Sequence, residues 1–308
     1  MRGPQFSVIL PTYNGEATLV RAVESVRSQT DHDWELVAVD DGSTDSSFDL
    51  LEEAASNDER IRVFRTSNSG GPARPRNKAI AEARGRALCL LDQDDYWLPE
   101  KLELERPLLD QPEVGIVFSD AWIERAGSGR RLYSDVWGRS KRGHVTADLI
   151  ASNFIPALTA VVPVEVARAV GPLDERLVGV DDYHWWLRIT MAGYRVADVT
   201  SPLAVYCVSA SNLSHDHDVY LSALDKCLRD LARSHPLWRK ELLDRREELR
   251  RHGFDYFANR LARNGIDGLG AAQVAKKMAT LIRTWPEAKR AIASALPPAR
   301  RPTRREPD

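Results

Sequence analysis

The 308-residue sequence lacks the features that mark membrane and secreted proteins. No uninterrupted apolar stretch approaches the roughly 20 residues that a bilayer-spanning helix needs. Residues 1–7 show no basic segment followed by an apolar one, so no secretory signal is visible. The three cysteines, Cys89, Cys207 and Cys227, form an odd set without CxxC spacing, which disfavours a disulfide framework and a structural zinc site. These absences predict a cytoplasmic protein.

Patterns typical of several large enzyme classes are missing as well. The sequence contains no G-x-S-x-G, no P-loop motif and no G-x-G-x-x-G. Their absence counts against nucleophilic serine catalysis and against P-loop and dinucleotide-binding enzymes. The chain is nevertheless 43% hydrophobic and 29% charged, which is the composition of an ordinary globular protein rather than of a disordered or fibrous one.

The formal net charge of −2 hides an uneven distribution of charge. Residues 231–308 carry 18 Lys and Arg against 9 Asp and Glu, whereas residues 1–230 carry 25 against 36. The acidic body argues against nucleic acid as a partner, because a nucleic-acid-binding domain is itself basic. The basic C-terminal region has two interpretations: a solvated helical face, or a surface for peripheral contact with anionic lipid at the inner face of the membrane.

Apolar strands and amphipathic helices alternate over the first hundred residues. Strands are expected at residues 8–10, 36–39, 61–64 and 87–91, with helices between them at 19–26, 48–55 and 78–83. Such alternation predicts an α/β fold, with a mostly parallel mixed sheet flanked by helices.

The later part of the chain is less regular. Residues 126–141 are rich in Gly, Ser and Arg and are expected to form a mobile loop. Beyond residue 215 the pattern is helical, including separate helices at 220–232, 241–251 and 254–263. The Pro/Arg-rich end, 297–308, is expected to be a disordered basic tail.

Polar side chains gather where the expected strands end. In open α/β sheets, ligands bind outside the carboxyl ends of the strands. Three such ends are Pro11-Thr12-Tyr13-Asn14, Asp40-Asp41-Gly42-Ser43 and Asp92-Gln93-Asp94-Asp95. The last follows a fully apolar strand, so Asp92 and Asp94 are directed into one cavity, where a cation would offset their repulsion. Carboxylate oxygens suit Mg²⁺ or Mn²⁺, which also bind the oxygens of a diphosphate.

Five sequence blocks, in order, resemble glycosyltransferase family 2. They span about residues 6–206 and are residues 8–16, 39–45, 70–77, 91–102 and 171–188. The resemblance implies a GT-A (Rossmann-like) fold with a C-terminal helical extension. Residues 1–215 would form the glycosyltransferase domain, with a nucleotide-sugar half at about 1–100 and an acceptor half at about 101–215. Residues 216–296 would form a helical C-terminal region.

The resemblance assigns the first blocks to the nucleotide. Pro11, Tyr13 and Glu16 belong to the loop that forms the wall for the base, with Tyr13 placed to stack on it. Asp41 would hydrogen-bond the base, and Asp40 would support Asp41.

The resemblance places the diphosphate and the metal at the next blocks. Arg76 would contact the base or a phosphate, a role that suits the fixed fork of its guanidinium. Asp92 would contact the ribose, or the metal through water. Asp94 would bind Mn²⁺ or Mg²⁺ directly, and Asp95 would share that duty.

The acidic pair Asp181-Asp182 opens an expected helix at 182–192. The resemblance implies that Asp182 is the general base that deprotonates the acceptor hydroxyl, and a helix N-terminus holds such a carboxylate ionised. The family usually has Glu-Asp at this point, so Asp181 is shorter by one methylene. The alternative is that both residues are helix caps without a chemical role.

A second departure lies after the last expected strand. The family's Tyr-Arg-x-His segment is Tyr206-Cys207-Val208-Ser209 here, so a serine replaces the histidine that contacts the metal or the diphosphate. His215 and His217 follow shortly, either as substitute ligands or as exposed loop residues.

The sequence therefore predicts an inverting, metal-assisted glycosyltransferase. It would move a sugar from a nucleotide-diphospho-sugar, first of all a UDP-sugar, to a hydroxyl of a glycan, lipid-linked, peptide or natural-product acceptor. Two alternatives stay open: a nucleotidyltransferase of related fold, and a non-catalytic nucleotide-sugar-binding module. The helices after residue 220 offer a surface for a homodimer.

Overall fold

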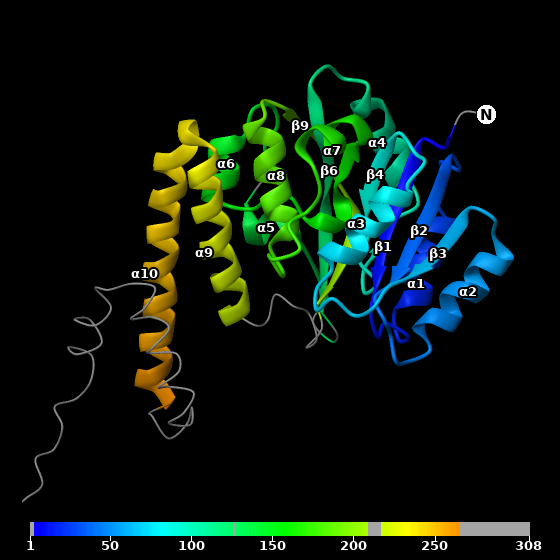
Figure 1. Cartoon of the computed structure of the whole chain (residues 1–308), viewed down its shortest axis with the longest axis horizontal. Helices are drawn as coiled ribbons and strands as arrows, with labels where there is room; N and C mark the ends of the chain where they lie inside the picture. Colours follow the sequence, from blue (N-terminus) through cyan, green and yellow to red (C-terminus); the bar gives the residue numbers. More distant parts are fainter. Residues whose placement is uncertain (1–2, 126, 128, 139, 209–216, 265–308) are drawn as a thin grey trace, which may run out of the picture. The chain divides into compact units, whose positions relative to one another are not determined.

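The computed structural model describes residues 3–125, 127, 129–138, 140–208 and 217–264. The chain divides into two units, residues 1–242 and residues 243–308. The first unit contains a nine-stranded sheet with helices on its faces (Figure 1). Helix α10 (Arg239–Asn264) begins in the first unit and continues into the second.

The first half of the sheet is built on four parallel strands, as the alternating pattern predicted. They are β1 (Phe6–Thr12), β2 (Trp34–Asp40), β3 (Ile61–Arg65) and β4 (Ala87–Leu90). Helices α1 (Leu19–Arg27), α2 (Ser47–Asn57) and α3 (Ala73–Glu82) connect them. Every residue of β1, β2 and β4 is buried, because helices cover both faces of the sheet. Since these strands are parallel, their carboxyl ends meet at one edge.

The later part of the chain adds mixed pairings to this sheet, whose full order is β3-β2-β1-β4-β8-β6-β9-β5, with β7 on β6. Its strands are β5 (Tyr96–Trp97), β6 (Val114–Arg125), β7 (Arg130–Leu132), β8 (Val161–Pro163) and β9 (Arg195–Val208). Its helices are α4 (Lys101–Leu109), α5 (Tyr133–Trp137), α6 (Thr146–Ala151), α7 (Val164–Val170), α8 (Asp181–Met191) and α9 (His217–Ser234), with 3-10 turns at Ala157–Thr159 and Pro236–Trp238. The predicted α/β class is confirmed.

Two expectations about secondary structure were wrong. The segment 126–141 contains β7 and α5, because anchors on β6 and β5 outweigh its Gly-rich composition. The helices expected at 241–251 and 254–263 form one continuous helix, α10, since Gly253 does not interrupt it. The tail at 297–308 lies outside the described residues. No helix within the described ranges is both long and apolar enough to cross a bilayer.

Strand β9 carries the chain back to the turn after β4. It runs parallel to β6 with register shifts around Ser119 and Asp120, and its far end pairs antiparallel with β5. The last residues of β9 therefore lie beside the turn that follows β4, and the backbone N–H of Cys207 donates to the Asp95 carboxylate at 2.8 Å.

A buried ion pair on α4 fastens this helix to the 3-10 turn at Ala157–Thr159. Lys101 and Glu105 are both fully buried, and the Lys101 Nζ donates to Glu105 Oε2 at 2.5 Å and to the Thr159 carbonyl at 3.1 Å. The same ammonium lies 4.6 Å from the ring centre of Trp97. Burial raises the pKa of Glu105 to about 7, although Lys101 opposes the shift. Each charge is thus tolerated only because the other is present.

We expect Lys101→Met to lower the free energy of unfolding by about 3–5 kcal/mol, because it leaves the Glu105 carboxyl buried without a partner. The double variant Lys101→Met/Glu105→Leu should regain most of the loss. The partly exposed pair Lys78 and Glu82 has the same spacing, so Lys78→Met is a matched control and should cost less than about 1 kcal/mol. Urea unfolding measures all three, and equal losses for Lys101→Met and Lys78→Met would contradict this account.

Candidate active site

The loop after β1 is fastened to the turn after β4. The backbone N–H of Tyr13 donates to Gln93 Oε1 at 2.7 Å, and Gln93 Nε2 donates to the Tyr13 carbonyl at 2.9 Å. Pro11 is buried within β1, whereas the Tyr13 residue is 45% exposed. The loop after β1 and the turn after β4 are thus held together by two hydrogen bonds. The Tyr13 ring beside them is open to solvent.

Glu16 joins the same loop to the start of α2. Its carboxylate accepts the backbone N–H of Ser46 at 3.0 Å, and its own N–H donates to Asp45 Oδ2 at 3.2 Å. The Asn14 side chain similarly accepts the Thr44 N–H at 2.8 Å. Glu16 therefore links the loop after β1 to the loop after β2.

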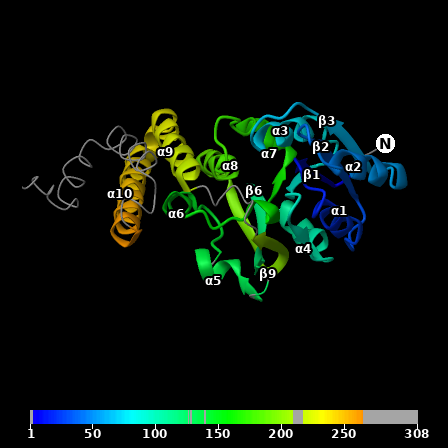
Figure 2. The ribbon, with the colours of Figure 1, turned by 90° about the horizontal axis from the view of Figure 1, so that it is seen from below.

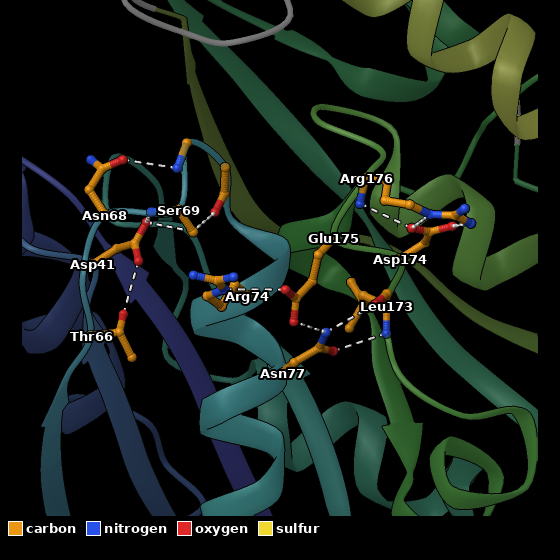
Figure 3. Close-up of polar contacts among 12 residues, drawn as sticks. Asp41, Thr66, Asn68, Ser69, Arg74, Asn77, Leu173, Asp174, Glu175 and Arg176 are labelled. Atoms are coloured by element: carbon orange, nitrogen blue, oxygen red, sulfur yellow. Dashed lines mark hydrogen bonds and ion pairs between the residues drawn. The ribbon is translucent and has the colours of Figure 1, made fainter.

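Asp40 and Asp41 fix the loops after β2 and β3. The Asp41 carboxylate accepts the Thr66 hydroxyl at 2.9 Å and both the N–H and the hydroxyl of Ser69, at 2.8 and 2.7 Å (Figure 3). Asp40 is fully buried and pairs with Arg65 Nε at 3.1 Å. Both carboxylates therefore hold the backbone around the edge of the sheet.

Arg76, on α3, joins two parts of the site that are distant in sequence. It is only 4% exposed, and its two terminal nitrogens donate to different carboxylates: Nη1 to Asp181 Oδ2 at 2.7 Å, and Nη2 to Asp92 Oδ1 at 2.5 Å. Burial by itself lowers the pKa of Arg76, but the negative charges of Asp92 and Asp181 outweigh it and raise that pKa. The guanidinium therefore stays charged and bridges the β4 turn to α8.

Helix α8 begins at Asp181, one residue before the expected start. The Asp181 side chain reaches Arg76 although it is one methylene shorter than the family's glutamate. Burial raises the pKa of Asp181, and Arg76 opposes this rise. The neighbouring Asp182 is partly exposed, and its Oδ1 accepts the N–H of Tyr183 at 2.7 Å. Desolvation and then the negative charge of Asp181 raise the pKa of Asp182 to about 7. One carboxylate is thus held by an ion pair, while its neighbour is poised to exchange a proton near neutral pH.

A second link between α3 and the chain before α8 lies beside the Arg76 bridge. The Asn77 side chain donates to the Leu173 carbonyl at 3.0 Å and accepts the Leu173 N–H at 2.9 Å (Figure 3). Glu175 accepts from Asn77 Nδ2 at 3.3 Å and pairs with Arg74 Nε at 3.2 Å. The loop that leads into α8 is therefore docked on α3.

Of the three acidic residues in the turn after β4, Asp92 is paired with Arg76, whereas Asp94 and Asp95 make no ion pair among the described residues. Asp94 is partly buried, and burial, followed by the charge of Asp92, raises its pKa to about 6. Its carboxylate therefore fits a cation, which would remove the need for a proton there. Asp95 is 1% exposed and accepts the Cys207 N–H; burial, followed by the charge of Asp94, raises its pKa well above the usual value. Within the described ranges, no three His, Cys, Asp or Glu side chains are grouped to hold a metal.

Arg21 is a site residue that the sequence did not reveal. From α1, its Nη2 donates to the Asp94 carbonyl at 2.7 Å and contacts Cys207 Sγ at 3.2 Å, and its guanidinium lies 4.7 Å from the ring centre of Tyr96. An arginine on an exposed helix face has no distinguishing pattern in the sequence. Gln93 and Asn77 lay inside the recognised blocks, but only the structure reveals the contacts they make.

The expectation that His215 and His217 replace the histidine missing at Ser209 cannot be compared with the structure. Ser209 and His215 lie outside the described residues, and so does the side chain of His217, the first residue of α9.

Trp185 and Trp186 in α8 are both buried, and the Trp185 indole N–H donates to the Gly171 carbonyl at 3.0 Å. Trp185 is therefore a core residue.

Comparison with known proteins identifies the family. The model of the family described as glycosyl transferase family 2 matches residues 7–155. The curated relative UDP-Glc:alpha-D-GlcNAc-diphosphoundecaprenol beta-1,3-glucosyltransferase WfgD of Escherichia coli is 30% identical over 185 residues, which are 59% of this chain and 68% of WfgD.

Two solved structures share the fold. The mannosyltransferase PcManGT from Pyrobaculum calidifontis, solved with GDP-Man and Mn²⁺, superposes with a TM-score of 0.64 at 21% identity and is matched over 95% of this chain and 86% of its own. TarS 1-349 of S. aureus, solved with UDP-GlcNAc, has a TM-score of 0.60 at 19% identity, over 94% of this chain and 83% of its own. The GT-A fold, the family match and the named relative agree: the chain belongs to glycosyltransferase family 2.

Proposed function

We propose that the chain transfers a sugar from a UDP-sugar to an acceptor hydroxyl with inversion at the anomeric carbon, and that Asp182 is the general base. The Arg76 bridge is the observation that carries this proposal. It joins Asp92, at the edge where the strands end, to the helix that opens with Asp181 and Asp182. A donor bound beside Asp92 and a base at the start of α8 would thus keep a fixed separation.

The relatives support a nucleoside-diphospho-sugar as donor. WfgD is named for UDP-Glc, the TarS structure contains UDP-GlcNAc and the PcManGT structure contains GDP-Man with Mn²⁺. Two of the three are uridine nucleotides, which favours UDP here. The exposed ring of Tyr13 offers a stacking surface for the base. Family membership favours glycosyl transfer over the alternatives of nucleotidyl transfer and simple binding.

The proposed reaction is a single displacement. The acceptor oxygen forms a bond to the anomeric carbon while the bond from that carbon to the diphosphate oxygen breaks, and the electron pair leaves with the nucleoside diphosphate. The acceptor proton passes to the Asp182 carboxylate. Attack from the face opposite the leaving group inverts the configuration. The raised pKa of Asp182 makes its carboxylate a stronger base than an ordinary aspartate.

We further propose that Asp94, aided by Asp92, holds Mn²⁺ or Mg²⁺. Asp94 has no ion pair in the described part of the chain, and burial, followed by the negative charge of Asp92, raises its pKa to about 6. When bound, such an ion offsets the negative charge that develops on the departing diphosphate. The diphosphate and water would supply its remaining ligands. Asp95, bonded to the backbone of Cys207, would hold β9 against the site.

Asp182→Asn should lower turnover by roughly 10²–10⁴, the usual contribution of a general base, because the amide cannot accept the proton. Binding of UDP should be unchanged, since Asp182 lies on the acceptor side of the bridge. The rate of UDP release and the Kd for UDP from calorimetry measure the two effects. Full turnover of Asp182→Asn would refute the role of Asp182.

The pH profile tests the same assignment without a mutation. Below its pKa the Asp182 carboxyl carries a proton and cannot accept another, so kcat/KM should fall about tenfold per pH unit below about pH 7 and be level above it. The charged groups that contribute most to the pKa of Asp182 are Asp181, Arg76 and Asp92, and Tyr133 and Cys227 also interact with it electrostatically. Assays of UDP release between pH 5.5 and 8.5 record the profile, and a level profile down to pH 5.5 would be inconsistent with this base.

Asp94→Asn should reduce the affinity for UDP in Mn²⁺ to that of the wild type in EDTA, because the variant loses the charged ligand of the cation. Asp49→Asn is a matched control, since Asp49 is an exposed carboxylate on α2. Its UDP affinity should keep its full dependence on Mn²⁺. Calorimetric titration of the three proteins with UDP decides the point: if Asp94→Asn keeps that dependence, another group holds the ion.

A further inference from the structure

The acidic turn after β4 is held from both faces of the sheet. Helices α1 and α3 lie on opposite faces, because the crossovers from β1 to β2 and from β3 to β4 run in opposite directions along the sheet and such crossovers are right-handed. Figure 2 shows α1 with α4 on one face, and α3 with α7 on the other. Arg76 reaches the Asp92 carboxylate from α3, and Arg21 reaches the Asp94 carbonyl from α1.

Asp94 is held differently from its neighbours in this turn. Asp92, Gln93 and Asp95 are each held through the side chain. Asp94 is held through the main chain instead, since Arg21 Nη2 donates to its carbonyl at 2.7 Å. This contact fixes the peptide that carries Asp94 without occupying an oxygen of the carboxylate, which stays available to a cation.

The Arg21 guanidinium is fixed by groups from three segments of the chain. Besides the Asp94 carbonyl, Nη2 contacts Cys207 Sγ on β9 at 3.2 Å, and Cζ lies 4.7 Å from the centre of the Tyr96 ring on β5. The Arg21 residue is exposed, so holding it in one geometry costs side-chain entropy. The charged hydrogen bond and the contact with the aromatic ring offset that cost.

The helix that carries Arg21 is itself anchored. Helix α1 packs into the core through buried residues on both sides of Arg21. Just beyond the end of α1, Gln29 Nε2 donates to the Leu98 carbonyl at 2.9 Å, and Gln29 Oε1 accepts the Leu102 N–H at 3.1 Å. The helix is thus tied to the stretch of chain that follows the acidic turn, and Arg21 reaches the turn from a fixed base.

We infer that Arg21 is a positioning residue for the metal site: by holding the Asp94 carbonyl, it sets the direction in which Asp94 presents its carboxylate to Mn²⁺ or Mg²⁺. The inference rests on the proposed function and deepens it, since it names a residue that acts on the cation through a ligand. The sign of the effect is diagnostic. The positive charge of Arg21 by itself repels the cation, so loss of the charge alone would strengthen cation binding, whereas loss of the orientation weakens it.

Calorimetric titrations of the full chain with UDP, at a series of Mn²⁺ concentrations and in EDTA, test the inference. For Arg21→Met, the Mn²⁺ concentration that gives the half-maximal rise in UDP affinity should increase about 10–100-fold, the usual effect of losing a group that orients a metal ligand. In excess Mn²⁺ the UDP affinity should return to that of the wild type, because the Asp94 carboxylate is still present. Arg21→Lys keeps the charge and can donate to one acceptor, so it should need less Mn²⁺ than Arg21→Met.

Arg27→Met is the matched control. Arg27 lies on the same helix and also donates to a main-chain carbonyl, but to that of Ala54 on α2, at 2.9 Å. This variant should need as much Mn²⁺ as the wild type, and thermal melting of each variant shows whether the fold is intact.

Three results would overturn this inference alone: an equal or lower Mn²⁺ requirement in Arg21→Met than in the wild type, an equal rise in Arg27→Met, or a UDP affinity of Arg21→Met that does not recover in excess Mn²⁺. Wild-type UDP binding that does not depend on Mn²⁺ would instead overturn the metal site of the proposed function, and with it the role of Arg21.

Discussion

The arrangement of the site depends on one buried guanidinium. Arg76 has almost no contact with solvent. It stays charged because two carboxylates from distant parts of the chain, Asp92 and Asp181, each accept a hydrogen bond from one of its terminal nitrogens. Removing either carboxylate would leave a buried charge undercompensated, so the pairing is strongly favoured once the fold has formed. The turn after β4 and the start of α8 are consequently held at a fixed distance, and a displacement reaction between donor and acceptor needs such a fixed geometry.

The remaining contacts of the site reinforce the same constraint. Gln93 fastens the loop after β1 to the acidic turn, and Asn77 docks the loop before α8 onto α3 through two hydrogen bonds to Leu173. Desolvation and the negative charge of Asp181 raise the pKa of Asp182, whereas the positive charge of Arg76 lowers it. The base strength proposed for Asp182 therefore depends on the charges of the neighbouring ion pair.

The sequence predicted those features that local patterns determine. Strands β1, β2 and β4 are buried on both faces, and each therefore appears in the sequence as an apolar run ended by polar residues. The start of α8 at Asp181 was visible from the acidic pair before an amphipathic run. The contacts of Arg76 could not be predicted, because they join residues 16 and 105 positions apart. The segment with β7 and α5 was mistaken for a mobile loop, since its anchors are single side chains, Tyr96 and Asp120, on other strands.

The most direct test of this account is the pH profile of kcat/KM after substitution of Asp181. The account holds that the negative charge of Asp181 contributes to the raised pKa of Asp182. Asp181→Asn should therefore shift the acidic limb of the profile to lower pH, whereas Asp181→Glu, which keeps the charge, should leave the limb near its wild-type position. An acidic limb that stays in place in Asp181→Asn would contradict the proposed coupling between the ion pair and the base.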